Sequence, residues 1–288
     1  MVYNNLSGYL KGKYGHRLKK ICVDGGFSCP NRDGKLSTGG CIFCGERGAG
    51  EHIDNSISIR EQVESAILSA KDDDEFIVYF QNFTNTYADV STLKNRYDAA
   101  LISDRIKVLS IGTRPDCIDE EKAKLIASYQ DKYEVWIELG LQTANDKTAA
   151  IINRSYPLSV FENAISILNK YSIKTVVHMI IGLPSEGPED FLATAKYIIG
   201  KHPFGIKIHS LYVMKGTRLE MLYHQKRYTP IGFDEYTDTV SEILKMIPSD
   251  IVIHRLTGDC PRGLLVAPEW SLDKNEVLKA IQDKLKTV

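Results

Sequence analysis

The sequence contains no uninterrupted apolar run of about twenty residues, the length that a membrane-spanning helix requires. It also shows no positively charged leader followed by an apolar segment, so we expect no signal peptide. Basic and acidic residues are balanced, 36 against 37, so no global field attracts the protein to nucleic acid. With 288 residues, 43% of them hydrophobic, we expect a cytoplasmic globular protein with one large core and no membrane contact.

Cysteine is also scarce, with six residues in the chain. Disulfides are not expected, because scattered cysteines in a long chain without a leader are typical of a reducing cytosol. Three of the six nevertheless lie close together: Cys29, Cys41 and Cys44 are separated by eleven and two residues. Eight of the 21 glycines lie in the same segment, 25–50, where they allow positive φ and a close approach of the backbone to a bulky group.

Three thiolates on one glycine-rich loop are the ligand set of a reactive metal site. They can hold three corners of a four-iron cluster and leave the fourth iron open for a substrate or cofactor. The spacing therefore predicts an open [4Fe-4S] cluster at Cys29, Cys41 and Cys44. The alternative is a zinc site completed by Cys22 or His16. Cys22, however, lies in a short apolar strand pattern, where a buried small side chain is the commoner role.

After this loop, short β-branched runs alternate with amphipathic stretches, which is the pattern of βα units around a parallel sheet. The predicted strands are 20–24, 76–80, 107–112, 134–140, 174–182, 205–213 and 251–255. The predicted helices between them are 58–71, 90–103, 119–131, 159–171, 188–200 and 233–246. Six repeats predict an α/β fold with a partial (β/α)6 TIM-like barrel. A helical pattern with lysines at 271–288 predicts a solvated terminal helix.

Two basic stretches interrupt the balance of charge. One surrounds His16, and the other runs from 201 to 227; they contain Lys11, Lys13, Arg17, Lys19 and Lys20, and Lys201, Lys207, Lys215, Arg218, Lys226 and Arg227. Such stretches are more often solvated surface than contacts to a phosphate backbone. They permit binding to RNA without requiring it.

Polar residues gather where the predicted strands end, which is the edge of a parallel sheet where chemistry collects. They include Gln81 and Thr84, Arg114 and Asp116, Glu138 and Gln142, His178, and His254 and Arg255. A single member of this set carries little weight. Glu138, for example, is open to the alternative of a buried carboxylate satisfied by hydrogen-bond donors. Polar groups at successive strand ends, together with the cysteine loop, indicate a ligand site.

Four segments together resemble the radical S-adenosylmethionine (SAM) superfamily: 25–34, 80–87, 138–143 and 255–270. Within it they are similar to the branch of the Elongator catalytic subunit and oxygen-independent coproporphyrinogen oxidase, and most of all to the YhcC/YtqA (MnmL-type) group. The resemblance implies a partial barrel of the radical SAM type as a single domain over 1–288. Its core would cover about 16–248 and a C-terminal extension 249–288.

The resemblance implies that Cys29, Cys41 and Cys44 hold a [4Fe-4S] cluster whose open iron binds S-adenosyl-L-methionine. One electron then splits the sulfonium bond and releases a 5′-deoxyadenosyl radical that abstracts hydrogen from the substrate. It also implies an electron donor such as flavodoxin or ferredoxin.

Residues expected to contact SAM follow from the same resemblance. Gln81 and Thr84 lie in the segment that receives the methionine amino group, and Glu138 lies where a carboxylate can accept the ribose hydroxyls, supported by Gln142. Three further residues, Ile180, Gly182 and Leu211, match segments that pack against the adenine. Plain core packing is the alternative for Ile180 and Leu211.

The residues left for the substrate are Arg114, Asp116, His178, His254, Arg255 and Asp259, and we predict catalytic roles for Arg114, His254, Arg255 and Asp259. Arg114 precedes a proline in extended backbone and is suited to gripping a carboxylate or phosphate. His254 and Arg255 follow an apolar strand that would deliver them to the mouth of the barrel. Cys117 and Cys260 are able to donate a hydrogen atom to a radical, but buried filler is their commoner role.

The group that the sequence resembles is associated with the wobble uridine of tRNA, where it converts a 5-carboxymethylaminomethyl side chain to 5-aminomethyl. This implies the anticodon loop of tRNA as the substrate, with the base flipped into the barrel mouth. One alternative keeps the radical chemistry and changes the substrate to a small metabolite or a porphyrin-like molecule. Another is a zinc-binding protein without enzymatic activity that docks RNA through its basic N-terminal segment.

Overall fold

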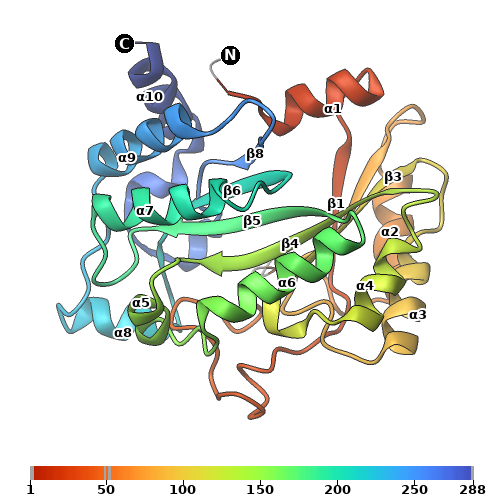
Figure 1. The fold of residues 1–288 in the computed structure, drawn as a ribbon, viewed down its shortest axis with the longest axis horizontal. Helices are drawn as coiled ribbons and strands as arrows, with labels where there is room; N and C mark the ends of the chain where they lie inside the picture. Colours follow the sequence, from red (N-terminus) through yellow and green to blue (C-terminus); the bar gives the residue numbers. More distant parts are fainter. Residues whose placement is uncertain (1–2, 49, 51–52, 287–288) are drawn as a thin grey trace.

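Seven parallel strands form one curved sheet, in which the spatial order of the strands follows their order along the chain (Figure 1). The structure is a computed structural model that describes residues 3–48, 50 and 53–286. The strands are β1 (Lys19–Val23), β2 (Phe76–Phe80), β3 (Ile106–Thr113), β4 (Glu134–Gln142), β5 (Lys174–Ile181), β6 (Gly205–Ser210) and β8 (Val252–Arg255). Every neighbouring pair is parallel, so all carboxyl ends share one edge. The predicted partial barrel is confirmed.

Helices connect successive strands and cover the outer face of the sheet (Figure 1). They are α2 (Ile59–Leu68), α3 (Val90–Ala100), α4 (Glu120–Ala127), α6 (Leu158–Lys170), α7 (Pro188–Ile199) and α9 (Phe233–Met246). Polar caps fix where several of them begin: the Ser58 and Asp89 side chains accept hydrogen bonds from the first turns of α2 and α3. No helix of the described residues is long and apolar enough to cross a membrane.

Apolar side chains fill both faces of the curved sheet. The larger cluster lies between the strands and the outer helices, and all five residues of β2 are buried. A smaller cluster gathers residues from the amino-terminal parts of the strands and from α1 (Leu6–Tyr14), including Ile77, Val108, Trp136 and Leu10. It occupies the amino-terminal part of the inner face, and the polar residues of that face therefore lie toward the carboxyl edge.

Some elements were not predicted from the sequence. They are α1, α5 (Asp146–Ile151), α8 (Arg218–His224) and a small antiparallel sheet of β7 (Val213–Met214) and β9 (Leu265–Ala267). The strand expected at 205–213 is interrupted after Ser210 because the chain turns there to form β7. The expected terminal helix is α10 (Lys274–Lys286), which packs against α9; residues 287–288 lie outside the described part. Because β8 pairs with β6, the predicted core and extension share one sheet.

Helix α1 is attached to the amino-terminal end of the barrel through one carboxylate. Glu134, at the start of β4, has a side chain only 5% exposed. It accepts hydrogen bonds from Tyr9, Lys13, Tyr14, Lys174 and Trp136 at 2.5–2.9 Å. Burial opposes ionisation of Glu134, but these donors outweigh it and lower its pKa to about 2.

Replacing Glu134 with Gln is expected to lower the free energy of unfolding by ~1–3 kcal/mol at pH 7, because buried charge-assisted hydrogen bonds are lost. A carboxylate with a depressed pKa stabilises the fold above its unfolded pKa and loses this effect as pH falls through its folded pKa. The difference between wild type and Glu134→Gln should therefore shrink from pH 4.5 toward pH 2, as measured by urea unfolding. Glu64→Gln, which alters an exposed pair with Arg60, is the control and should change stability by less than ~0.5 kcal/mol.

Candidate active site at the carboxyl edge of the sheet

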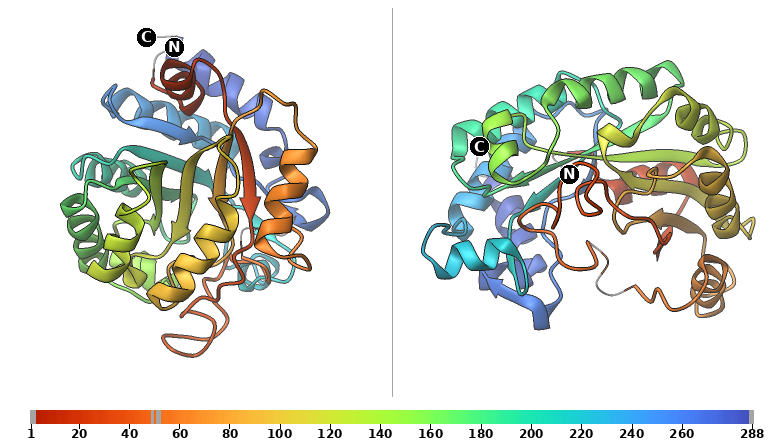
Figure 2. Two further views of the ribbon diagram at one scale, coloured as in Figure 1. Left: turned by 90° about the vertical axis from the view of Figure 1, so that its right-hand side faces the viewer. Right: turned by 90° about the horizontal axis from the view of Figure 1, so that it is seen from below.

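The cysteine loop lies at the carboxyl edge of the sheet, opposite α1. In the left panel of Figure 2, the strand arrows point toward the orange-red segment that follows β1, whereas α1 lies at the other end. The loop is tied to its surroundings by main-chain and side-chain contacts. Asn31 donates its amide to the carbonyl of Asn153 at 2.6 Å, and the Thr84 amide donates to the Ser28 carbonyl at 3.2 Å. These bonds place the three cysteines over the polar strand ends.

A glycine is required at one point of this loop. Gly40 has φ +74°, and a Cβ there would lie 2.9 Å from Nε of Arg32. Arg32 needs this space because it reaches across the loop and donates to the carbonyls of Cys44 and Gly45. Gly40 thus leaves room for Arg32 to cross the loop and form these hydrogen bonds.

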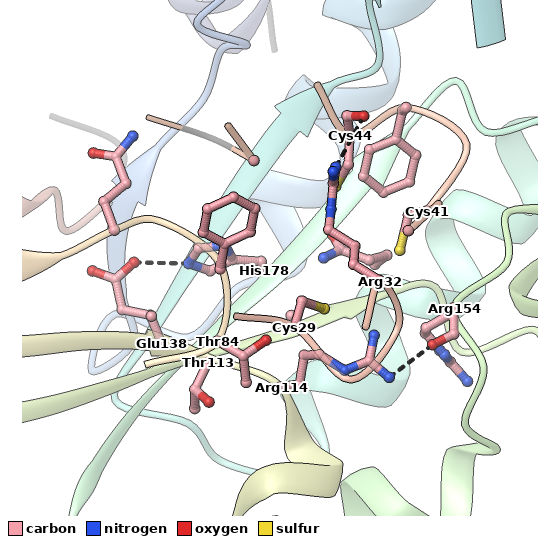
Figure 3. Close-up of a pocket in the computed structure, with 18 of the residues that line it drawn as sticks. Cys29, Arg32, Cys41, Cys44, Thr84, Thr113, Arg114, Glu138, Arg154 and His178 are labelled. Carbon is pink, nitrogen blue, oxygen red and sulfur yellow. Dashed lines mark hydrogen bonds and ion pairs between the residues drawn. The ribbon is translucent and has the colours of Figure 1, made fainter. Parts of the chain in front are cut away.

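The three cysteines line one cavity, here called the main cavity, together with residues from four strand ends (Figure 3). Its walls include Cys29, Cys41, Cys44, Arg32, Gln81, Thr84, Arg114, Glu138, Gln142, Arg154, Tyr156 and His178. Nine of the sequence-predicted site residues therefore meet in one place: the three cysteines, Gln81, Thr84, Arg114, Glu138, Gln142 and His178.

Positive charge surrounds the thiols. Figure 3 shows Arg32, Arg114 and Arg154 on the cysteine side of the main cavity. A hydrogen bond from Cys41 and the nearby Arg32 guanidinium lower the pKa of the Cys44 thiol to about 7. Thiolates are the form that binds metal, so this environment favours the ligand state of Cys44. The same hydrogen bond, together with burial, raises the pKa of the Cys41 thiol.

Arg154 is a site residue that the sequence did not single out. Its side chain is 1% exposed, although it carries a charge. The guanidinium donates to the carbonyls of Leu141, Thr143 and Tyr156 and to the Asp146 carboxylate, at 2.6–3.1 Å. It therefore fixes the end of β4 at the cavity wall. No spacing or periodicity marks this arginine, whereas Arg32 lies between two of the cysteines.

Arg114 lies beside the cysteines, but its guanidinium is already engaged. It forms a two-pronged ion pair with Asp116 at 2.8 and 2.9 Å, and it donates to the Arg154 carbonyl at 3.0 Å. To bind a carboxylate or phosphate of the substrate, as predicted, Arg114 would have to break its ion pair with Asp116. The arrangement supports a role for Arg114 in placing positive charge near the thiols.

Thr84 carries a buried hydroxyl with no hydrogen-bond partner in the described part of the chain. An unsatisfied buried polar atom is costly unless a ligand completes it. Because Thr84 lines the main cavity next to the cysteines, this hydroxyl fits the expected contact with a polar cofactor group. Gln142, at φ +71°, also borders the cavity at an irregularity of the β4–β5 pairing.

A second compartment adjoins the main cavity and shares Phe43, Cys44, Gln142 and His178 with it. Ile180 and Leu211, expected to pack on adenine, line this compartment together with His209 and Tyr212. Gly182 lies just outside it, where its φ of +92° and the close approach of Ile231 leave no room for a side chain.

Glu138 forms the centre of a buried polar group at the wall of the main cavity. It is 1% exposed and accepts hydrogen bonds from Ser110 and His178, both at 2.8 Å, and from Lys207. Burial opposes its ionisation, but Lys207 and His178 hold its pKa well below the usual value. Protein donors thus occupy both oxygens that were expected to receive the ribose hydroxyls. Lys207, predicted as solvated surface, is instead 4% exposed: that expectation was wrong.

The last strand places its polar residues away from both compartments. His254 packs on the rings of Trp136 and Phe204 at 5.0 and 5.7 Å between centroids, among the residues near the amino ends of the strands. Arg255 pairs with Asp259 at 2.6 Å, and Asp259 also pairs with Lys274 of α10. His254, Arg255 and Asp259, which were predicted to be catalytic, line neither the main cavity nor the second compartment.

The residues named for a zinc site lie apart from the cysteine loop. His16 pairs with Glu75 at 3.1 Å, next to the amino end of β2. Cys22 lies on β1, where the charges of Lys20 and Lys207 act on it. In the part of the chain that the structure describes, no three Cys, His, Asp or Glu side chains are arranged to hold a single metal ion. Cys117 is buried and Cys260 partly buried, and neither lines the main cavity.

Comparison with protein families decides the class of the protein. A model of the radical SAM superfamily matches residues 34–198, more than half of the chain, and a model of the radical SAM C-terminal domain matches residues 203–287. The chain belongs to the radical SAM superfamily. It is therefore an enzyme that binds a [4Fe-4S] cluster and SAM and cleaves SAM reductively.

Individual relatives agree with this assignment. YtqA of Bacillus subtilis, named only as an uncharacterized protein, is 37% identical over 287 residues, covering 98% of this chain and 89% of the relative. A tRNA uridine(34) acetyltransferase of Dehalococcoides mccartyi is 31% identical over 163 residues, 55% of this chain and 35% of the relative. The solved structure of Elp3 from Methanocaldococcus infernus has a TM-score of 0.68 at 16% identity, covering 93% of this chain and 63% of that one. At this identity the last comparison shows the fold alone.

Serine at Cys29, Cys41 or Cys44 should each abolish cluster assembly, because a hydroxyl does not replace a thiolate ligand of iron. The measurements are iron and sulfide content, visible absorption after anaerobic reconstitution, and 5′-deoxyadenosine formed with a strong reductant. Cys260→Ser is the matched control and should keep all three values. An intact cluster in any of the three loop variants would contradict the ligand assignment.

Proposed function

We propose that the enzyme modifies the wobble uridine of tRNA and converts its 5-carboxymethylaminomethyl side chain to 5-aminomethyl. The observation that carries this proposal is the similarity, over 55% of the chain, to an enzyme named for uridine 34 of tRNA. The flipped base would enter between the cysteine loop and the strand ends, whose residues line both compartments. The bound cluster and SAM would supply the radical that removes hydrogen from the carbon between amine and carboxylate.

Arg114 and Arg255 are the two arginines that we consider for the substrate carboxylate. Arg255 lines neither compartment and would have to reach the substrate from their edge, but it is the less firmly paired of the two. Its guanidinium is one-third exposed and donates to a single oxygen of Asp259. The Arg255 charge also acts on His178 and His209, which line the second compartment. The guanidinium of Arg114, by contrast, donates two hydrogen bonds to the Asp116 carboxylate.

We also propose that Thr84, Gln81 and Gln142 receive the polar groups of SAM and that Ile180 and Leu211 pack on its adenine. The unpartnered Thr84 hydroxyl supports the first part, and the apolar wall of the second compartment supports the second. Gly182 would contribute through its backbone turn next to Leu211. Flavodoxin or ferredoxin stays a prediction for the electron donor.

Thr84→Val tests the first of these contacts. The variant removes a buried hydroxyl that has no protein partner, so the free energy of unfolding should stay unchanged or rise. SAM binding should weaken about tenfold, because one hydrogen bond is worth ~1–1.5 kcal/mol. Equilibrium dialysis with the reconstituted enzyme measures the affinity. Thr92→Val on α3, whose hydroxyl donates to the capping Asp89, should leave SAM binding unchanged.

The substrate is tested by nucleoside mass spectrometry of tRNA from a deletion strain, which should accumulate 5-carboxymethylaminomethyluridine and lack the 5-aminomethyl product. The purified enzyme with SAM and reductant should then form this product on the isolated tRNA. Unchanged levels of both nucleosides in the deletion strain would contradict the proposal. Conversion of the free nucleoside at the rate of tRNA would instead favour a small-molecule substrate.

A further inference from the structure

His178 occupies the border between the two compartments, on the opposite side of the main cavity from the cysteines (Figure 3). Its Nε2 lies 2.8 Å from Oε2 of Glu138, and the side chain is 17% exposed. Glu138 cannot turn away, because Ser110 holds its other oxygen and Lys207 pairs with it. The imidazole is therefore oriented by a fixed carboxylate on one side and open to the cavity on the other.

The hydrogen bond to Glu138 also sets the tautomer. A carboxylate only accepts, so Nε2 carries the hydrogen and Nδ1 is left with its lone pair. In the described residues Nδ1 makes no hydrogen bond. A carboxylate that holds one imidazole nitrogen while the other faces a reacting group is the arrangement of a general base that later acts as a general acid.

The charges around His178 come from three elements besides its own strand β5: Glu138 on β4, Lys207 and His209 on β6, and Arg255 on β8. The His209 ring lies 5.3 Å from that of His178, between centroids, and its buried Nε2 has no partner in the described residues. Burial lowers the pKa of His178, and the hydrogen bond that His178 donates to Glu138 opposes this effect. The imidazole is thus neutral at pH 7 and able to accept a proton.

We propose that His178 is the proton-transfer residue of the substrate site and acts on a secondary amine that bears a carboxymethyl group. Glu138 is its positioning residue. This inference rests on the proposed function and names a catalytic residue for it. It assigns Glu138 to His178 in place of the ribose.

Abstraction of a hydrogen atom from the carbon of R–NH–CH2–COO⁻ leaves R–NH–CH•–COO⁻. A one-electron acceptor, for which the bound cluster in its oxidised state would serve, would take up one electron, while the N–H proton passes to Nδ1 of His178 and a C=N bond forms. His178 returns this proton to the nitrogen, water adds to the carbon, and the C–N bond breaks. The products are glyoxylate and the primary amine in its ammonium form, R–NH3⁺, which carries the proton from His178 and the two protons of the added water.

The test uses reconstituted enzyme and tRNA whose carboxymethyl carbon carries deuterium. His178→Gln keeps a donor for Glu138 but cannot accept a proton. Deuterium should still enter 5′-deoxyadenosine at close to the wild-type rate, while formation of amine and glyoxylate falls by about 100-fold or more, the usual contribution of general acid–base catalysis. His16→Gln, at the opposite end of the barrel, is the matched control and should retain both activities. Cluster absorption and SAM binding confirm that the variant is folded.

Three outcomes would overturn the inference. Amine formation at the wild-type rate in His178→Gln would show that His178 moves no proton. A parallel fall in deuterium transfer and amine formation would indicate substrate binding as its role. Absence of deuterium transfer in the wild-type enzyme would refute the proposed substrate itself, and the inference with it.

Glu138→Gln separates a positioning role from a structural one. Loss of the carboxylate removes the charge that stabilises protonated His178, so the apparent pKa in the pH profile of amine formation should move downward. A merely structural effect would lower the rate at every pH and leave the profile in place, which would contradict the assigned role of Glu138.

Discussion

A carboxylate buried inside the curved sheet sets the conditions for the polar residues around it. An isolated charge in such a place costs several kcal/mol unless it is paired and hydrogen-bonded. Glu138 is compensated by Lys207, His178 and Ser110, which come from two strands on one side and one on the other. This group lies between the apolar residues at the amino ends of the strands and the cavity at their carboxyl ends. It therefore fixes where along the strands the interior changes from apolar to polar.

The parallel sheet explains why residues distant in sequence meet at this depth. All carboxyl ends lie at one edge, and the cysteine loop leaves β1 at the same edge. Because Gln81, Thr84, Glu138 and Gln142 lie at the ends of predicted strands, the sequence could predict that they share a cavity with the cysteines, and they do. The barrel itself could also be predicted, because β-branched runs alternate with amphipathic stretches.

Other features could not be predicted, because they depend on tertiary pairing. Lys207 reads as part of a basic surface stretch, yet its position on β6 points it inward at Glu138. His254 was expected at the mouth of the barrel because it follows an apolar strand, but its ring packs against Trp136 and Phe204 instead. Strand β7 has two residues, which is too few to show a periodic pattern. Helix α1 overlaps a stretch whose lysines were interpreted as basic surface, so it was not predicted.

The arginines at the cysteine side show that the site is prepared electrostatically before a ligand arrives. Arg154 is held by backbone carbonyls and Arg114 by Asp116, so neither gains its order from a bound group. A cluster with thiolate ligands and the SAM carboxylate bring negative charge into this region, and fixed cations stabilise it without reorganising. On the opposite wall, His178 is hydrogen-bonded to Glu138 through Nε2, which leaves Nδ1 of His178 as an acceptor. The two walls therefore have different roles: the arginines on the cysteine side stabilise negative charge, and His178 on the other side transfers protons.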